Sequence, residues 1–478
     1  MRALLLLTWL IVLAHSGFCQ GNAKETQPMK NEDRIQPWPA NPRYWQYKGQ
    51  PVLLLGGTRE DNLFQIPDLK EHLDLLASVG GNYIRNTMSD RDERDVYPYR
   101  RLESGKYDLD QWNDEYWTRF ADLLRWTAER DIIVQIEVWD RFDLSDVRDM
   151  KNWQRHPYRP ANNVNYTGEE AGLADAYPDH PSQDKQPFYH TIPGMKEYQP
   201  KYDRIRHYQE RFVGKLLGQS LPYGNVLYCM NNETSTDPKW GQHWMQFIKA
   251  KAAAAGLSVY VTDMFDDGWQ PEKSGKVRLQ LDHPELYDFI DLSQVNSRNF
   301  GEDHWNRLTW ASQQLQAHPR PLNHTKIYSA GQTSFGSGTP QDGIERFWRN
   351  LLGGSASSRF HRPTSGIGLN EQSQACLKSA RKVETLIKFW DLAPHQELLS
   401  DREKNEAYLG AKPGEAYVLF FCNGGAVKLD LSGVAGTFAV KWVEISAGDW
   451  RGEGKMTGGG PAALAAPGAG PWVAVLTR

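Results

Sequence analysis

Short runs of apolar residues alternate along the chain with longer stretches in which apolar residues recur every three or four positions. The runs predict eight β-strands, at residues 52–55, 82–85, 132–138, 225–230, 258–262, 289–295, 321–328 and 355–360. Helical spacing follows most of these strands, as for Trp117, Phe120 and Leu124. Repeated strand–helix units favour a (β/α)₈ TIM barrel over an open sheet, so the predicted fold class is α/β. No G-x-G-x-x-G motif follows the first strand, which argues against a dinucleotide-binding fold.

The segments on either side of this alternation have a different character. Residues 1–20 combine a basic start, an uncharged apolar run and small residues, which predicts a cleaved signal peptide. Residues 21–40 are polar and contain Pro, so we expect a loose leader before a barrel domain over 41–397, which opens with a hairpin at 43–51. Short apolar runs punctuated by Gly and Pro predict a C-terminal β-sandwich over 398–478. Within it, the Gly-, Ala- and Pro-rich residues 458–470 are expected to form a flexible loop.

The signal peptide predicts a secreted or periplasmic protein. Cys19 lies near the expected cleavage point, but Phe18 in front of it fits a lipoprotein signal poorly, so we do not expect a lipid anchor. No other apolar stretch approaches the ~20 residues that a membrane-spanning helix needs. We therefore expect no membrane span in the mature chain.

Composition narrows the classes of partner. The formal net charge is -4 over 478 residues, which gives no reason to expect nucleic acid as a partner. The 18 Trp and 21 Tyr offer flat apolar faces on which sugars stack, although the same rings also fill large cores. The 4 Cys are widely spaced, and neither H-x-H nor H-E-x-x-H occurs, so no disulfide framework, metal or other cofactor is predicted. Carbohydrate is the expected partner, and no oligomeric state is indicated.

Candidate site residues stand at the ends of the predicted strands. In a (β/α)₈ barrel the active site forms at the carboxyl ends of the strands. The side chains expected there include carboxylates, amides, cations and aromatics: Arg85, Asn86, Glu137, Trp139, Asp140, Asn232, Glu233, Asp263, Asn296, His324, Lys326, Tyr328 and His361. Such a set suits cleavage of a glycosidic bond, in which one carboxylic acid protonates the leaving oxygen and a second carboxylate attacks or activates water.

The pair Asn232-Glu233, directly after the apolar fourth strand, resembles the Asn-Glu pair of the large retaining clan of (β/α)₈-barrel glycoside hydrolases. The resemblance implies that Glu233 is the general acid/base and that Asn232 contacts the 2-hydroxyl of the sugar. The opening hairpin and the C-terminal sandwich also resemble a subgroup of apiosidase-like proteins whose C-terminal β-domain is named as collagen-binding.

The chain departs from this family at the seventh strand, where the nucleophilic Glu would stand. Lys326 occupies that place. Three interpretations remain open: a second carboxylate from another strand (Glu137, Asp140 or Asp263) with an inverting mechanism, a different register of the seventh strand, or sugar binding without cleavage. If Lys326 lines the site, it favours an acidic sugar such as a uronic acid.

Two functions follow from these patterns. The first is a secreted glycoside hydrolase with Glu233 as general acid and Glu137 or Asp263 as its partner. Its substrate would be held by Arg85, Asn86, Trp139, Asp140, Asn232, Asn296, His324, Lys326, Tyr328 and His361. The second is a carbohydrate-binding or adhesion protein that has lost catalysis. A structural alternative for Glu137 is a salt bridge with Arg85 or Lys326. The long segment 141–200, rich in His, Tyr and Pro, is expected to cover the barrel mouth.

Overall fold

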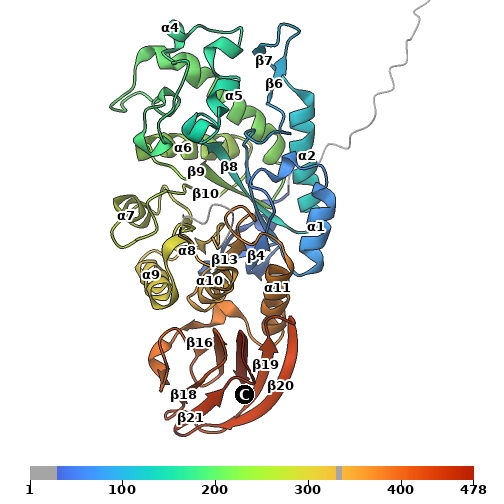
Figure 1. Cartoon of the computed structure of the whole chain (residues 1–478), viewed down its shortest axis with the longest axis vertical. Coiled ribbons are helices and arrows are strands. Elements are labelled where there is room, and N and C mark those ends of the chain that lie inside the picture. The colour runs from blue at the N-terminus through green and yellow to red at the C-terminus, as the bar shows by residue number, and fades with distance from the viewer. Residues whose placement is uncertain (1–28, 330–335) are drawn as a thin grey trace, which may run out of the picture.

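The computed structural model describes residues 29–329 and 336–478 (Figure 1). The predicted signal peptide and the first part of the leader lie outside these residues. Figure 1 shows three regions along the long axis of the molecule: a loop-rich region around α4 at one end, the strands and their helices in the middle, and an all-β region at the other end.

Eight parallel strands occur among the described residues, one for each predicted strand. They are β4 (Leu54–Gly57), β5 (Tyr83–Thr87), β8 (Ile133–Asp140), β9 (Val226–Asn232), β10 (Val261–Thr262), β11 (Ile290–Asp291), β12 (Leu322–Asn323) and β13 (Ser357–Phe360). Parallel ladders join β5, β8, β9 and β10, then β11 and β12, then β13 and β4. The ladders do not run unbroken around the ring, so the fold is mixed α/β and the strands do not close into a continuous barrel.

Side-chain oxygens stand in for ladder carbonyls where the ladders are interrupted. The amide of Leu55 donates to Asn82 Oδ1 at 2.9 Å, and the amide of Val261 donates to Asp288 Oδ2 at 2.8 Å. Backbone bonds remain at the same junctions, for example from Asn82 to the carbonyl of Leu55 at 2.9 Å. The predicted strands at 258–262, 289–295 and 321–328 are therefore correct in position but shorter, with two ladder residues each.

The helices that follow the strands pack their apolar faces on the strands. They are α1 (Leu69–Ser78), α2 (Asp114–Ala128), α5 (Asp203–Ser220), α6 (Pro238–Ala254), α7 (Gly275–Asp282), α9 (Gly301–Gln314), α10 (Pro340–Leu352) and α11 (Glu371–Glu384). The spacing of apolar residues does not reveal α7, which has eight residues and buries Val277, Gln280 and Leu281. The start of α6 follows its sequence: the Asp237 side chain accepts a hydrogen bond from the amide of Lys239, and Pro238 fills the first helical position.

Two insertions build the region above the strands in Figure 1. The first is the hairpin of β6 (Tyr99–Arg101) and β7 (Tyr107–Trp112). The second follows β8 and contains η3 (Val147–Asp149), α3 (Asn152–Arg155), η4 (Pro160–Asn162), α4 (Gly168–Ala171), η5 (Pro181–Gln183), η6 (Pro187–Tyr189) and η7 (Pro200–Tyr202). Trp153, Tyr158 and Phe188 of this insertion are buried. Its inner part is therefore a packed layer.

The N-terminal end of the described chain differs from the expected loose leader. It forms η1 (Asn31–Asp33) and a three-stranded sheet of β1 (Gln36–Trp38), β2 (Asn41–Tyr47) and β3 (Gln50–Val52). Arg34 is buried because its guanidinium donates to the carbonyls of Leu221, Tyr223 and Ser258. The Arg34 side chain thus anchors this N-terminal segment through three hydrogen bonds. The composition of the segment does not predict an ordered structure.

The C-terminal region consists of two antiparallel sheets, as predicted. One sheet has the order β14 (Ala393–Pro394), β16 (Ala407–Lys412), β17 (Ala416–Phe421), β22 (Trp472–Thr477), β19 (Thr437–Glu444) and β20 (Asp449–Thr457). The other has the order β15 (Leu399–Ser400), β18 (Ala426–Asp430) and β21 (Pro461–Ala465). The expectation of a flexible loop over residues 458–470 is wrong in part, since β21 pairs with β18 and buries Leu464.

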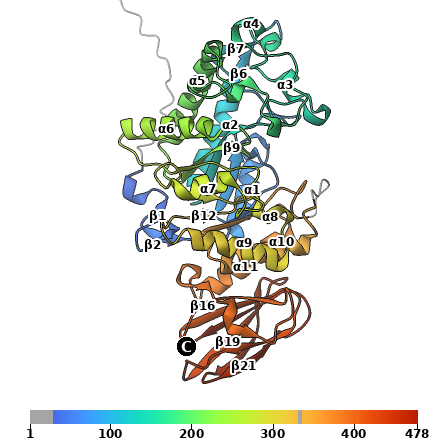
Figure 2. The same cartoon turned by 90° about the vertical axis from the view of Figure 1, so that its left-hand side faces the viewer.

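This β-region packs on the helices α9, α10 and α11 (Figure 2). The ring of Trp348 in α10 stacks on Phe420 of β17 with centroids 6.0 Å apart, and Trp305 of α9 meets Tyr408 of β16 at 5.1 Å. These side chains belong to one continuous buried cluster with the residues around the parallel strands. The remaining elements are η2 (Leu63–Gln65), α8 (Val295–Arg298), η8 (Phe389–Asp391) and η9 (Gln396–Leu398).

Candidate active site

Glu233 stands immediately after β9 with a φ of 63°, in the left-handed region. A residue with a β-carbon is strained there, and such strain concentrates at functional sites. The turn is held on its far side because the amide of Thr234 donates to the carbonyl of Met264 at 2.6 Å. The backbone thereby presents the Glu233 carboxylate at the carboxyl end of the strands.

Four side chains surround the Glu233 carboxylate. Its Oε1 accepts hydrogen bonds from Lys326 Nζ at 2.9 Å, from the Tyr328 hydroxyl at 2.8 Å and from Gln294 Nε2 at 2.8 Å. Its Oε2 lies 3.4 Å from Nη2 of Arg141. The donors come from three separate segments, after β8, β11 and β12, while Glu233 itself follows β9. The site is therefore assembled by the tertiary fold.

The charges around Glu233 decide its protonation state. Burial alone raises the pKa of this carboxyl, but Lys326 and Arg141 together outweigh burial and hold the pKa well below its usual value. Glu233 is thus ionised at neutral pH. A general acid must carry a proton, so the expectation that Glu233 serves as the general acid does not fit the free protein.

Asn232 connects the surroundings of the Glu233 carboxylate to buried charged side chains through hydrogen bonds. Its Oδ1 accepts from Lys326 Nζ at 2.6 Å and from Arg85 Nη2 at 2.9 Å, and its Nδ2 donates to Asp140 Oδ2 at 3.1 Å. Arg85 is fully buried and pairs with Glu137 at 2.5 Å and with Asp61. The structure gives Glu137 the salt bridge foreseen as its structural alternative. Burial raises the pKa of Glu137, against the charges of Arg85 and Lys326.

Two neighbouring cavities open around Glu233, with volumes of about 150 and 310 Å³. Both are lined by Phe142, Arg148, Glu233 and Tyr328, so they form one cleft. The smaller cavity adds Asp61, Arg91, Met150, Asn232, Lys326, His361, Arg362 and Ser365. The larger adds Arg141, His180, Ser182, Asp266, Trp269, Gln294, Ser297 and Arg298. Phe142, Arg148, Met150, His180 and Ser182 belong to the insertion predicted over 141–200.

A second carboxylate faces the larger cavity. Oδ2 of Asp266 lies 2.7 Å from Nη1 of Arg141, whose Nη2 holds Glu233. Lys276 Nζ lies 4.0 Å from the other oxygen of Asp266. The side chains of Asp266 and Glu233 are both 18% exposed. One guanidinium therefore holds two carboxylates at the same cavity.

Asp263, predicted as a catalytic partner, lies outside the cleft. It is fully buried, and its Oδ1 accepts from the Thr234 hydroxyl at 2.5 Å and from the amide of Met264 at 2.9 Å. Its Oδ2 faces Gly241 of α6. Burial raises the pKa of Asp263 to about 7. The structure does not bring the predicted Asp263 to the cleft, and the carboxylate found there, Asp266, comes three residues later.

Asn296 and His324 form a buried polar network behind the cleft. Asn296 contacts His324 Nδ1 and His304 Nε2, each at 3.0 Å, and His324 Nε2 lies 3.0 Å from the Ser355 hydroxyl. Burial lowers the pKa of His324 to about 3, which keeps its ring neutral. Both residues are fully buried, so the prediction that they contact substrate is not supported by their position.

Asn86 and Trp139 also point away from the cleft. Asn86 is buried and accepts from the amide of Phe64 at 3.0 Å. Trp139 lies among aromatic rings of α5, α6 and the insertion, with centroid distances of 5.1 Å to Phe212 and 5.7 Å to Trp244. Both hold neighbouring elements together, and the prediction of sugar contacts for them is not supported.

His361 and Tyr328 do reach the cleft, with their rings 4.9 Å apart. Burial is the main cause that lowers the pKa of His361. Burial and the Glu233 charge raise the pKa of Tyr328 well above its usual value, so the phenol keeps its proton and donates a hydrogen bond to the carboxylate. Asp140 lies just beneath, where its carboxylate accepts a hydrogen bond from Asn232 and forms an ion pair with Arg91.

The sequence did not predict several residues that line the cleft, among them Asp61, Arg91, Arg141, Asp266 and Gln294. Except for Gln294, which lies inside the predicted sixth strand, they follow strand ends by one to several residues. The pattern of apolar residues stops at the strand end, whereas these side chains are brought in by loops. Asp266 carried a weak signal, as the second Asp after the fifth strand in Asp-Met-Phe-Asp.

Metal sites and membrane spans can be judged for residues 29–329 and 336–478. These residues contain no group of three or more His, Cys, Asp or Glu side chains placed to hold a metal ion. In the same residues, no helix has both the length and the apolar character needed to cross a membrane.

Comparison with known proteins places the fold among glycoside hydrolases. The chain is similar to a glycoside hydrolase family 5 structure from Bacteroides vulgatus ATCC 8482, with a TM-score of 0.61, 10% sequence identity and 95% of each chain covered. A second structure, described as a glycoside hydrolase, has a TM-score of 0.61 and 10% identity over 95% of this chain and 99% of its own. A maltogenic α-amylase, AmyB from Thermotoga neapolitana, has a TM-score of 0.51 and 10% identity over 89% and 99%. No family model and no curated protein matches the sequence.

At these identities the likeness concerns the fold, which this chain shares with glycoside hydrolases over nearly its whole length. The expected likeness to (β/α)₈ glycosidases is thereby confirmed for the fold alone. The narrower resemblance to apiosidase-like proteins with a collagen-binding domain stays a prediction.

Proposed function

We propose that this protein is a glycoside hydrolase whose active site is the cleft around Glu233. The observation that carries the proposal is the pair of carboxylates, Glu233 and Asp266, held on one guanidinium at the carboxyl end of parallel strands. Glycosidic cleavage needs two carboxyl groups with different protonation states at the scissile bond.

The charges around the two carboxyl groups indicate which one acts as nucleophile or base and which one as proton donor. Glu233, kept ionised by Lys326 and Arg141, attacks the anomeric carbon or activates water beside it. Asp266 is the second carboxyl group at the cavity, and we assign to it the transfer of a proton to the departing glycosidic oxygen; its ion pair with Arg141 has to open for it to carry that proton. Tyr328 and Gln294 fix the orientation of the Glu233 carboxylate through their hydrogen bonds. This division replaces Glu137 and Asp263, the partners first expected from the sequence.

The charge of the cleft favours an acidic sugar as substrate. Lysine and arginine side chains outnumber carboxylates along its walls: Arg91, Arg141, Arg148, Arg298, Lys326 and Arg362 against Asp61, Glu233 and Asp266. Lys326 itself is neutralised by Glu233, so it is not the group that selects an acidic sugar. We assign that role to the rim, where Arg298 is exposed beside the ring of Trp269.

A panel of 4-nitrophenyl glycosides tests the proposal, with neutral sugars, a glucuronide and a galacturonide side by side. We expect turnover on an acidic member. Substrates whose leaving groups differ in acidity then distinguish the role of Asp266 from that of Glu233. A nitrophenolate leaves without protonation, so Asp266→Asn should spare nitrophenyl substrates and lose methyl glycosides, whereas Glu233→Gln should lose both. Equal rates for wild type and Glu233→Gln would remove the assignment.

A second candidate function is carbohydrate binding without cleavage. The observation that favours it is Lys326, which stands at the end of the seventh strand and closes an ion pair with Glu233 at 2.9 Å. In that case the cleft would bind acidic oligosaccharides, more tightly in Glu233→Gln because Lys326 is then unpaired, and no substrate of the panel would turn over.

We also propose that the protein acts outside the cytoplasm, secreted or in the periplasm. The support for this is the amino-acid pattern of residues 1–20. N-terminal sequencing of the mature protein tests it, with a start near residue 20 as the expected result. A mature chain that still begins with Met1 would contradict export by signal cleavage.

A further inference from the structure

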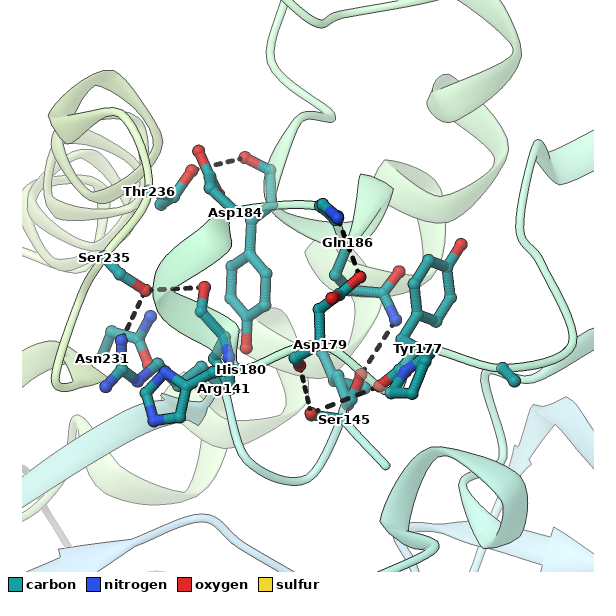
Figure 3. Close-up of a pocket in the computed structure, with 16 residues that line it drawn as sticks. Arg141, Ser145, Tyr177, Asp179, His180, Asp184, Gln186, Asn231, Ser235 and Thr236 are labelled. Carbon is teal, nitrogen blue, oxygen red and sulfur yellow. Dashed lines mark hydrogen bonds and ion pairs between the residues drawn. The ribbon is translucent and has the colours of Figure 1, made fainter. Parts of the chain in front are cut away.

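Arg141 stands between the cleft and a neighbouring cavity of about 180 Å³, which Figure 3 shows. On the side of the cleft, its Nη1 donates to Asp266 Oδ2 at 2.7 Å and its Nη2 to Glu233 Oε2 at 3.4 Å. A group that fixes this guanidinium therefore acts on both carboxylates of the proposed reaction.

The hydroxyl of Ser235 fixes the guanidinium from the other side. Its oxygen accepts a hydrogen bond at 2.5 Å from Nη1 of Arg141, the same nitrogen that bonds Asp266. The hydroxyl donates in turn to the carbonyl of Pro181 in the insertion at 3.0 Å (Figure 3). Because its proton is committed to that carbonyl, the hydroxyl meets Arg141 as an acceptor.

The main chain of the same residue holds a second cation beside Asp266. Lys276 Nζ donates to the carbonyl of Ser235 at 3.0 Å and lies 4.0 Å from Oδ1 of Asp266. Arg141 and Lys276 thus both bond to Ser235, one at the hydroxyl and the other at the carbonyl.

Ser235 itself lies outside the cleft. It lines the neighbouring cavity, and it is not among the described residues that line either part of the cleft. Its place is set by the turn that presents Glu233, two residues earlier, in which the amide of Thr234 bonds the carbonyl of Met264. Any effect of the Ser235 hydroxyl on the reaction therefore passes through Arg141.

The reaction makes a specific demand on Arg141. A carboxylate paired with a guanidinium resists protonation, so the ion pair between Asp266 and Arg141 has to open before Asp266 carries a proton. Arg141 is only 4% exposed, and a buried guanidinium that loses a partner is costly. Its bond to Ser235 does not depend on the charge of Asp266, so this bond keeps the guanidinium in place while the ion pair is open.

We propose that Ser235 is a positioning residue, which holds Arg141 beside Glu233 while Asp266 takes up and donates its proton. The proposal rests on the hydrolase function proposed above. As the glycosidic C–O bond breaks, its electron pair stays on the leaving oxygen, and that oxygen takes the proton from the Asp266 carboxyl group. The Asp266 carboxylate then pairs with Arg141 again.

Ser235→Ala tests the proposal, because it removes the hydroxyl and keeps the carbonyl that holds Lys276. We expect kcat on a methyl glycoside to fall about tenfold, with KM unchanged, since one hydrogen bond to a charged group is lost. The matching 4-nitrophenyl glycoside needs no proton for its leaving group, so its kcat should be unchanged. Ser235→Thr keeps a hydroxyl and should restore turnover of the methyl glycoside.

Ser145→Ala is the matched control. The Ser145 hydroxyl also bonds carbonyls of the cavity wall, those of Asp179 at 3.2 Å and Tyr177 at 3.5 Å, but it does not contact Arg141 (Figure 3). This variant loosens the same wall without releasing the guanidinium. It should leave kcat unchanged on both substrates.

A second measurement needs no turnover. Rotation of the Arg141 guanidinium about its Nε–Cζ bond can be followed by ¹⁵N exchange NMR on the full chain, with the signal assigned from Arg141→Lys. Loss of the Ser235 bond should make this rotation about tenfold faster in Ser235→Ala than in the wild type, Ser145→Ala or Ser235→Thr.

The two measurements separate this proposal from the hydrolase function. Faster rotation together with a loss confined to the methyl glycoside supports it. Equal losses on both leaving groups, or equal rotation in the wild type and Ser235→Ala, would overturn it. If the wild type hydrolyses no glycoside, the hydrolase function fails, and the rotation rate alone decides whether Ser235 positions Arg141.

Discussion

Replacement of Lys326 by Met is the sharpest perturbation of the site, because it removes one ammonium group and keeps the shape of the side chain. Lys326 is 2% exposed, and its Nζ lies 2.9 Å from Glu233 Oε1. The same ammonium also bonds Asn232 at 2.6 Å. The variant leaves a buried carboxylate with Arg141 as its remaining cation.

The size of the effect follows from the distance. At 2.9 Å and an effective dielectric constant of about 20, the attraction between the two charges is about 6 kcal/mol. That corresponds to about four pKa units as an upper bound, since one unit is about 1.4 kcal/mol. Removal of one partner of a buried pair destabilises proteins by about 3–5 kcal/mol, which is the loss we expect at pH 7.

The effect of Lys326→Met on the unfolding free energy should depend on pH. In the wild type the pKa of Glu233 is depressed, so its contribution to stability is present above about pH 4.3, the unfolded value, and falls away below it. In Lys326→Met the pKa rises, and protonation relieves the unpaired charge. The difference in unfolding free energy between the two proteins should therefore be largest at neutral pH and shrink as the pH falls.

Urea denaturation of the wild type, Lys326→Met, Glu233→Gln and the double variant between pH 4 and 8 measures this coupling. Lys249→Met is the control, because Lys249 lies 2.7 Å from Asp288 but is 34% exposed, and such a pair contributes about 1 kcal/mol or less. A cost in Lys326→Met that is small, or that does not change with pH, would refute the proposed ionisation of Glu233.

Three further predictions concern the surroundings of the site. Burial raises the pKa of Asp263 to about 7, so stability falls as the pH rises from about 4 to 7 and stays reduced above that. Asp263→Asn should therefore gain up to about 4 kcal/mol over the wild type at pH 7 and above and keep full turnover, and loss of turnover would restore its catalytic role. Arg85→Met leaves the buried carboxylate of Glu137 without its ion-pair partner, while Asp61 keeps Arg91 and Arg362, and should cost about 3–5 kcal/mol in urea denaturation; a cost below about 1 kcal/mol would show that water reaches Glu137. Trp348→Ala removes the ring that stacks on Phe420 and should cost about 3–5 kcal/mol in a single unfolding transition; two separate transitions would show that the β-region folds independently.

The order of strands and helices could be predicted because buried strands leave a strong apolar signal. Residues 132–138 form such a run, and β8 covers Ile133–Asp140. The signal fails where polar side chains replace ladder contacts, as Asp288 does for β10. It also fails for Arg34, whose burial depends on carbonyls that are about 190 and 220 residues away in sequence.

The site could be predicted in part, for a similar reason. Asn232, Glu233, Lys326 and Tyr328 stand at strand ends, where position alone brings them to the cleft. Asp266, in contrast, is placed by the loop after β10, and no periodic pattern extends into that loop. The protonation state of Glu233 could not be predicted, since it depends on how closely Lys326 and Arg141 approach its carboxylate, and the sequence does not give these distances.

Turnover by Glu233→Gln is the most direct test of the account. The measurement is kcat on the best substrate of the glycoside panel, with substrate binding followed separately. The account predicts a loss of at least about 100-fold in kcat with binding retained, because the amide preserves the shape of the side chain but cannot act as a carboxylate. A Glu233→Gln protein that turns over within a few-fold of the wild type would contradict it.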